Sequence, residues 1–158
     1  MTVADLRGAP LQPLEYFQSP TGRIEDVVVG TCVVFTKTVS ESDVYLYAGI
    51  TGDFSPNHVD EEYMRGGAYG SRIAHGTLLV GFMSTASARL RIGRTVSLGY
   101  DRIRFIHPVR FGDTIATRYT VESVDLARRR ITAGVQCINQ HRQLVAVATN
   151  IKAFVDAA

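Results

Sequence analysis

Residues 73–90 read IAHGTLLVGFMSTASARL, and this stretch decides the fold. Its larger apolar side chains recur three and four positions apart, which is the spacing of neighbours on one helix. Nearly all remaining positions are small or apolar, so the stretch predicts a long helix that is buried rather than amphipathic. Small residues such as Gly81, Ser84 and Ala88 would let this helix approach a sheet closely. The apolar positions are Leu78, Leu79, Phe82, Met83, Ala86 and Leu90.

The chain beyond this helix changes to the composition of strands. Four segments rich in Val, Ile, Thr and Tyr follow, and turn residues separate them. Upstream, residues 31–39 form another β-branched run. Because helices and strands come in runs rather than in strict alternation, the sequence predicts an α+β fold with a mostly antiparallel sheet. The four downstream segments are 96–106, 114–124, 130–140 and 143–154.

Helix signals also lie between the first strand and the long helix. Ser40 is a typical N-cap, and Asp43, three positions later, completes a capping pattern ahead of apolar residues at helical spacing. Gly52 favours the end of that helix. We expect residues 52–59 to form a loop and residues 60–64 to begin a short acidic helix.

Length, composition and charge restrict the class of protein. With 158 residues, 46% of them hydrophobic, the chain can form one domain with a real core. We expect an N-terminal extension over residues 1–23 and the domain over residues 24–158. The net charge of +2 does not favour a nucleic-acid partner. The isolated Cys32 and Cys137 favour a reduced, cytoplasmic setting, and the sequence lacks the pattern of a signal peptide or membrane helix.

The most informative chemistry lies in GDFSPNH, residues 52–58, and in Gly76, which follows His75. Asp53 and His58 combine a carboxylate with an imidazole, and such a pair can divide acid and base roles near neutral pH. A glycine that opens a helix offers an unpaired N–H in a region of positive potential. This combination predicts the addition or removal of water next to a carbonyl group. The residues leave open which of the pair acts as acid and which as base.

These motifs resemble those of the MaoC-like dehydratases, in the (R)-specific enoyl-CoA hydratase branch of the hotdog fold. The family motif reads Gly-Asp-x-Asn-Pro-aliphatic-His, followed downstream by a His-Gly pair that opens the central helix. Residues 52–58 and 75–76 match it, with Ser55 in place of asparagine and Asn57 in place of the aliphatic residue. The resemblance covers roughly residues 24–156. Two flanking phrases also fit, TVSESDV at 38–44 and PVRFGDT at 108–114.

The resemblance implies a single hotdog domain, in which a curved antiparallel sheet wraps around residues 73–90. It implies that Asp53 and His58 are the catalytic pair, that Gly76 binds the thioester carbonyl, and that Ser84 binds substrate. The implied substrate is an acyl-CoA thioester, with no metal and no cofactor beyond the coenzyme A of the substrate itself. Two such domains normally pair sheet edge to sheet edge, so we expect a homodimer with no nucleic-acid or membrane partner.

Rival interpretations remain for the function and for single residues. The same chemistry can act on an acyl-carrier-protein thioester. A thioesterase normally needs a carboxylate on or near the central helix, and residues 73–90 contain none. A non-catalytic acyl-CoA-binding subunit has no need to keep both Asp53 and His58. Gly76 can instead be a turn glycine and Ser84 a small packing residue, and we expect His75 to be a structural partner of the turn.

Overall fold

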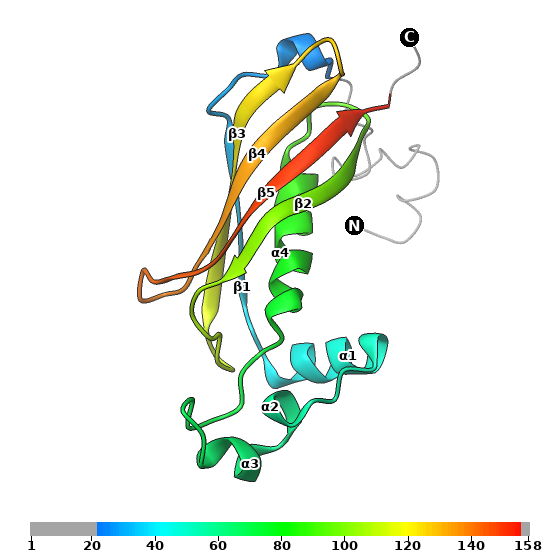
Figure 1. Cartoon of the computed structure of the whole chain (residues 1–158). Helices are drawn as coiled ribbons and strands as arrows, with labels where there is room; N and C mark the ends of the chain where they lie inside the picture. Colours follow the sequence, from blue (N-terminus) through cyan, green and yellow to red (C-terminus); the bar gives the residue numbers. More distant parts are fainter. Residues whose placement is uncertain (1–21, 156–158) are drawn as a thin grey trace, which may run out of the picture.

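A five-stranded antiparallel sheet with one long helix along one face forms the body of the molecule (Figure 1). The structure, a computed structural model, describes residues 22–155. The strand order is β1-β3-β4-β5-β2, and every neighbouring pair is antiparallel. This arrangement confirms the predicted α+β hotdog fold. The strands are β1 (Cys32–Thr38), β2 (Thr95–Phe105), β3 (Thr114–Asp125), β4 (Arg130–Ile138) and β5 (Leu144–Phe154).

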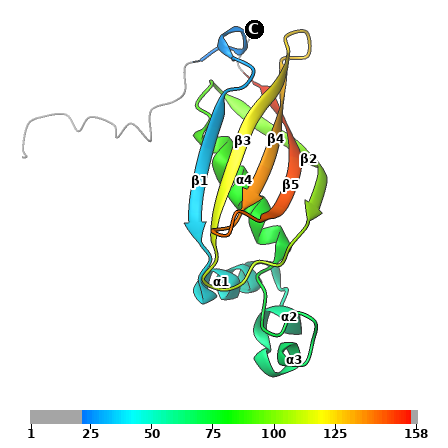
Figure 2. The same ribbon diagram turned by 90° about the vertical axis from the view of Figure 1, so that its left-hand side faces the viewer.

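Most of the helical structure lies between β1 and β2. The long helix α4 runs along the sheet, and three shorter helices gather beyond its N-terminal end (Figures 1 and 2). No helix within residues 22–155 is long and apolar enough to cross a membrane. The predicted extension over residues 1–23 lies almost wholly outside the described residues. The helices are η3 (Ile24–Asp26), α1 (Glu41–Thr51), α2 (Pro56–Val59), α3 (Glu61–Arg65) and α4 (Gly76–Arg89).

The ends of α1 follow from local sequence chemistry, as predicted. The Ser40 hydroxyl accepts a hydrogen bond from the Asp43 amide at 3.2 Å, and the Asp43 carboxylate accepts one from the Ser40 amide at 2.8 Å. Gly52 ends the helix in the left-handed conformation, with a φ of 81°. The expectation of a loop over residues 52–59 is wrong in part. Pro56 begins the one-turn helix α2, because its fixed φ suits the first position of a helix.

The sheet covers only one side of α4. Its buried side chains face the sheet, where α4 packs mainly on β1 and β3. The expectation of a helix buried on nearly every side is therefore wrong for the single chain. The physical reason is that small residues pack equally well in a core or at a surface, so their composition does not reveal which side a sheet will cover. The exposed positions are Thr77, Gly81, Ser84, Thr85, Ala88 and Arg89.

The segment that enters α4 is extended, and the helix begins at Gly76 rather than at the predicted Ile73. Ile73 forms a β-bridge with Arg110, and the Ala74 amide donates to the Val109 carbonyl at 2.8 Å. These backbone contacts hold the segment against the chain that links β2 to β3. The Ala74 amide is therefore bonded to Val109, whereas in a helix that began at Ile73 it would point along the helix axis.

An arginine connects this entry segment to the short helices. The Arg72 guanidinium contacts the carboxylates of Glu41, at 2.7 Å, and Glu61, at 3.0 Å. It also lies over the ring of Phe111, 4.8 Å from the ring centre. The Arg72 side chain is 18% exposed, so these contacts are sheltered from solvent more than a surface ion pair is. Arg72 thereby joins α1, α3 and the β2–β3 connection beside the start of α4.

Candidate active site

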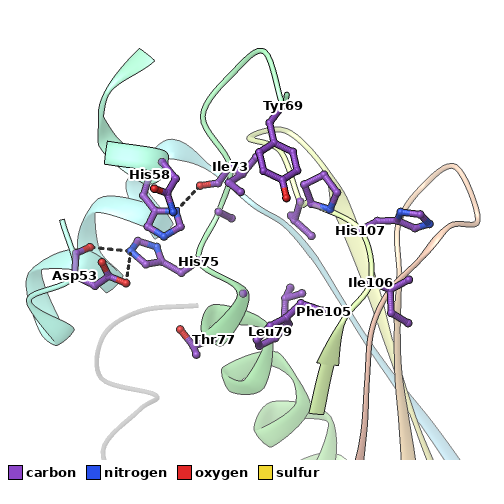
Figure 3. Close-up of a pocket in the computed structure, with 15 residues that line it drawn as sticks. Asp53, His58, Tyr69, Ile73, His75, Thr77, Leu79, Phe105, Ile106 and His107 are labelled. Carbon is purple, nitrogen blue, oxygen red and sulfur yellow. Dashed lines mark hydrogen bonds and ion pairs between the residues drawn. The ribbon is translucent and has the colours of Figure 1, made fainter. Parts of the chain in front are cut away.

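A cavity of about 390 Å³ opens where the short helices meet the N-terminal end of α4 and the end of β2 (Figure 3). Asp53, His58 and Gly76 all line it. Asp53 comes from the loop after α1, His58 from α2, and Gly76 is the first residue of α4. The structure therefore brings together three of the four site residues that the sequence predicts.

The imidazole of His58 is held in one orientation. The side chain is buried, with 7% of its residue surface exposed, and Nδ1 lies 2.8 Å from the Ile73 carbonyl oxygen. Because a carbonyl oxygen only accepts hydrogen bonds, Nδ1 carries a proton and donates it. The other ring nitrogen, Nε2, is then able to accept a proton, or to donate one once the ring is charged.

The carboxylate of Asp53 is hydrogen-bonded through one oxygen, and the side chain remains partly exposed. Its Oδ1 accepts hydrogen bonds from both the hydroxyl and the amide of Ser55. The Ser55 hydroxyl, followed by the Ser55 amide, lowers the pKa of Asp53, and the nearby His75 and His58 contribute less. Asp53 is therefore ionised near neutral pH. Ser55, which replaces the asparagine of the family motif, serves to orient this carboxylate.

His75 supports the site from behind, as the sequence predicts. Its ring is 1% exposed, and its Nε2 donates to the backbone carbonyl of Asp53 at 2.9 Å. The ring also stacks on that of His58, with centroids 3.7 Å apart. A backbone hydrogen bond of 3.0 Å from Ile73 to Asn57 adds to this link. Together these contacts fix the segment that carries Asp53 and His58 against the start of α4.

Gly76 combines an exposed helix terminus with a close packing contact. As the first residue of α4 it contributes one of the amides that have no acceptor within a helix, where the helix dipole adds positive potential. A side-chain carbon at this position would lie 2.9 Å from the ring of Phe105. The position therefore requires glycine because the Phe105 ring approaches closely, not because of the turn that the sequence left as an alternative.

Comparison with known proteins agrees with this geometry. The domain family described as MaoC like domain matches residues 27–141, which is well over half of the sequence. This chain belongs to the MaoC-like family. The resemblance seen in its motifs is thereby confirmed, and with it the class of hydratases and dehydratases.

Two relatives of this MaoC-like protein have names that state an enzyme activity. An (R)-specific enoyl-CoA hydratase from Rhodospirillum rubrum is 35% identical over 113 residues, which cover 72% of this chain and 78% of the relative. A 3-hydroxybutyryl-CoA dehydratase from Methylorubrum extorquens is 33% identical over 113 residues, or 72% of each protein. Among solved structures, an R-hydratase from Pseudomonas aeruginosa superimposes with a TM-score of 0.73 at 29% identity. That match covers 86% of this chain and 91% of the other.

Ser84, the fourth predicted residue, lies away from the other three. It is eight residues beyond Gly76 on α4, which corresponds to about 12 Å along the helix axis. Its side chain lines a second cavity near the C-terminal end of α4, together with Lys152 from β5. The structure therefore separates Ser84 from Asp53 and His58, and its role in binding substrate remains a proposal.

Several polar residues that line the catalytic cavity were not predicted as site residues. Asn57 stood inside the motif but counted only as a departure from the family pattern, and Tyr69 was indistinguishable from a core residue. His107 was one of four scattered histidines, and only its place just before the phrase at 108–114 could have indicated it. Thr77 immediately follows the predicted Gly76. All four line the cavity through tertiary contacts: Asn57, Tyr69, Thr77 and His107.

The side chains of Asp53, His58 and His75 also raise the question of a metal. Each offers a ligand atom, and these atoms lie within 4.8 Å of one another. However, a metal ion binds an imidazole in the plane of the ring, about 2.0–2.1 Å from nitrogen for zinc. The two rings are stacked with only 27° between their planes, so their lone pairs do not converge at that distance. The arrangement suits stacking and hydrogen bonding better than metal coordination.

Proposed function

We propose that this MaoC-like protein adds water reversibly to a 2-enoyl-CoA thioester and forms the (R)-3-hydroxyacyl thioester. The observation that supports this most strongly is the meeting of Asp53, His58 and Gly76 in one cavity. The ionisable side chains of Asp53 and His58 lie close together in Figure 3, beside the first turn of α4. The activities named for the relatives from Rhodospirillum rubrum and Methylorubrum extorquens support the same reaction class.

The chemistry follows from where each group can act. The thioester carbonyl accepts a hydrogen bond from the Gly76 amide, and a water molecule lies between Asp53 and His58. The water oxygen bonds to C3, the double-bond electrons move toward the thioester oxygen, and C2 receives a proton. The Gly76 amide stabilises the charge on that oxygen, and the loss of such a donor typically costs on the order of 3 kcal/mol. Asp53 is ionised and His58 keeps Nε2 available, so together they orient this water, remove one of its protons as its oxygen bonds to C3, and deliver a proton to C2, while the other water proton stays on the new hydroxyl.

The stereochemistry of the product tests this proposal. Asp53 and His58 occupy consecutive short elements on one side of the cavity, so the oxygen and the proton arrive at the same face of the alkene. We expect hydration of crotonyl-CoA in D₂O to proceed by syn addition and to give the (R)-alcohol. Chiral analysis of C3 and NMR of the deuterium at C2 measure the two outcomes. Anti addition or an (S) product would contradict the assignment of this loop, and absence of hydration at every chain length would contradict a CoA substrate.

We further propose that the protein acts as a homodimer joined along β2. This strand lies at one edge of the sheet, where its unpaired backbone groups offer a template for a second copy. It exposes Val96, Leu98 and Phe105, at 45%, 50% and 49% of their surfaces. Phe105 also lines the catalytic cavity, so a partner on this edge would border the site. Light scattering that showed a monomer at micromolar concentration would contradict this assembly.

The proposed reaction requires no metal and no organic cofactor, because coenzyme A arrives with the substrate. Proton transfer and charge stabilisation are both supplied by groups of the chain. A cytoplasmic location would match the supply of CoA thioesters. An acyl-carrier-protein thioester is the alternative substrate, and a parallel assay with crotonyl groups on both carriers distinguishes the two.

A further inference from the structure

A second cavity, also of about 390 Å³, lies near the C-terminal end of α4. Its lining contains two cationic side chains, Arg94 and Lys152, and no carboxylate. Four hydroxyl groups also line it, so hydrogen-bond donors predominate. The hydroxyl groups belong to Ser84, Ser87, Thr95 and Ser97.

Lys152 is an unusually placed cation. Only 5% of its surface is exposed, and burial lowers its pKa to about 8. No carboxylate within residues 22–155 lies at ion-pair distance from its ammonium group. Lys37, the other lysine of the sequence, instead pairs with Asp43 at 3.0 Å on the protein surface. Buried charges in proteins are normally paired. Lys152 departs from this rule, because its ammonium group has no negative partner among the described residues.

Capping of α4 explains one of the hydrogen bonds that Lys152 can make. Its Nζ donates to the Ser87 carbonyl at 2.7 Å, in the last turn of the helix, where cations are favourable. An ammonium group has three N–H donors, and the described residues supply this one acceptor. The buried hydroxyl of Tyr100 lies near the hydroxyls of Ser84 and Ser97, which also line this cavity. Capping therefore leaves two N–H donors of Lys152, which lines the cavity, without an acceptor among the described residues.

The second cavity lies on the same side of α4 as the catalytic one. The catalytic cavity is bordered by Gly76 on α4 and Phe105 at the end of β2, whereas Ser84 on α4 and Ser97 near the start of β2 border the second. Since α4 packs mainly on β1 and β3, the side toward β2 is less closely covered. About 12 Å along the helix separates Gly76 from Ser84. An extended carbon chain that advances roughly 1.3 Å per bond would span this distance with about nine bonds.

We propose that the second cavity binds a carboxylate group through Lys152, and that this carboxylate is the far end of the acyl chain of the substrate. The inference rests on the proposed hydratase function and assigns its substrate class, a 2-enoyl thioester that ends in a carboxylate. The Lys152 ammonium supplies the positive charge, and the Ser97 hydroxyl, which accepts a hydrogen bond from the Asn150 amide at 2.7 Å, still has its own proton to donate. A single carboxylate balances the one buried cation, whereas exposed Arg94 remains at the rim.

Matched substrates test this assignment directly. Pairs of 2-enoyl-CoA thioesters with equal chain length, ending either in a methyl group or in a carboxylate, are compared by kcat/KM at six to twelve carbons. We expect the wild-type protein to prefer the carboxylate by at least about tenfold near eight to ten carbons, as for a hydrogen-bonded charge pair. Lys152→Met should lower that preference at least about tenfold. Lys37→Met removes the other lysine and should leave the preference unchanged.

The same assay separates this inference from the function on which it depends. Hydration of methyl-ended substrates without any gain from a carboxylate would overturn the acyl-chain assignment and leave the hydratase function intact. Hydration of neither member at any length would overturn the function itself.

A binding measurement then decides whether the cavity binds a carboxylate at all. NMR of ¹⁵N-labelled lysine follows the ammonium groups of Lys152 and Lys37 while acetate or octanedioate replaces chloride at constant ionic strength. Saturable binding should raise the pKa of Lys152 and leave Lys37 unaffected. If this occurs without substrate preference, the carboxylate belongs to a separate molecule rather than to the acyl chain. No response of Lys152 to either anion, together with no substrate preference, would overturn the carboxylate site.

Discussion

Each end of α4 borders a cavity of about 390 Å³, and the charged groups in the two cavities differ. At the N-terminal end, the first turn of α4 borders the cavity in which we propose that negative charge develops, and the ionised Asp53 is held by Ser55. At the C-terminal end, the cation of Lys152 donates to a helix carbonyl and has no anionic partner among the described residues. Both arrangements agree with the helix dipole, which is positive at the N-terminus and negative at the C-terminus. The difference is that the first end contains its own reactive groups, whereas the second lacks the countercharge that a ligand would provide.

The two cavities also differ in how the chain builds them. Asp53 and His58 are five positions apart and occupy one short segment, which His75 joins to the start of α4. Ser84 and Lys152 come together only through tertiary packing, in which Lys152 on β5 contacts the carbonyl of Ser87 in the last turn of α4, 65 residues earlier in the chain. A site made by a short segment leaves a motif in the sequence, and a site made by distant elements does not.

The largest expected effect concerns the catalytic pair. Asp53→Asn and His58→Ala should each lower kcat by at least about 100-fold, the low end for general acid–base catalysis, while the fold is retained. The double variant should be little worse than the worse single variant, because both groups act on one water. The exposed His141→Ala, in the β4–β5 turn, serves as a control and should keep wild-type turnover. Near wild-type kcat in both single variants would refute the acid–base assignment.

At the opposite end of the helix, Lys152→Met should stabilise the protein without ligand, by up to about 3 kcal/mol at neutral pH. The pKa of Lys152 is about 8 in the folded state and about 10.5 when unfolded. Below pH 8 both states are protonated, so the full cost of the buried charge is present. Between the two values the unfolded state binds more protons, so wild-type stability rises with pH relative to the variant, and the difference disappears above about 10.5. Denaturant unfolding of both proteins across this range measures it, and a difference independent of pH would refute the buried-charge explanation.

A third change tests the close contact at the N-terminal end. Gly76→Ala places a methyl group against the Phe105 ring and should cost about 1–3 kcal/mol of unfolding free energy, as overpacking does. Phe105→Leu in the same protein should recover part of this loss. Gly81→Ala, on the same helix with no atom near the added carbon, is the matched control and should stabilise by about 0.5–1 kcal/mol. Equal effects at both glycines would show that the Phe105 contact is unimportant.

The smallest expected effect concerns the orientation of the carboxylate. Ser55→Ala removes the hydroxyl that contributes most to the lowered pKa of Asp53. The pKa of Asp53 should therefore rise toward its ordinary value, and the acid limb of kcat/KM should move to higher pH. The loss of activity should be greatest at acidic pH and slight at neutral pH. A pH–rate profile measures the shift, and exposed Ser123→Ala is the control. A profile unchanged from wild type would mean that Ser55 does not tune Asp53.

Much of the fold could be predicted because its signals are local. The caps of α1 depend on Ser40, Asp43 and Gly52, all within the helix or next to it, and strand boundaries were predicted to within two residues. The strand predicted over 130–140 ends at Ile138 because Asn139 turns the chain through hydrogen bonds with Gln143. Such side-chain contacts across a hairpin are not visible in strand composition.

The sequence by itself determined the family, the antiparallel α+β fold and the meeting of Asp53, His58 and Gly76 at one helix terminus. It could do so because short-range hydrogen bonds and periodicity leave a pattern in neighbouring positions. Only the tertiary structure decided that α4 is covered on one side and that Ser84 lies away from the catalytic pair. It also decided that Lys152 is buried at the C-terminal end of α4. Burial and the pairing of charges depend on which distant elements pack together, and a lysine in a strand has the same local pattern whether it meets solvent or the end of a helix.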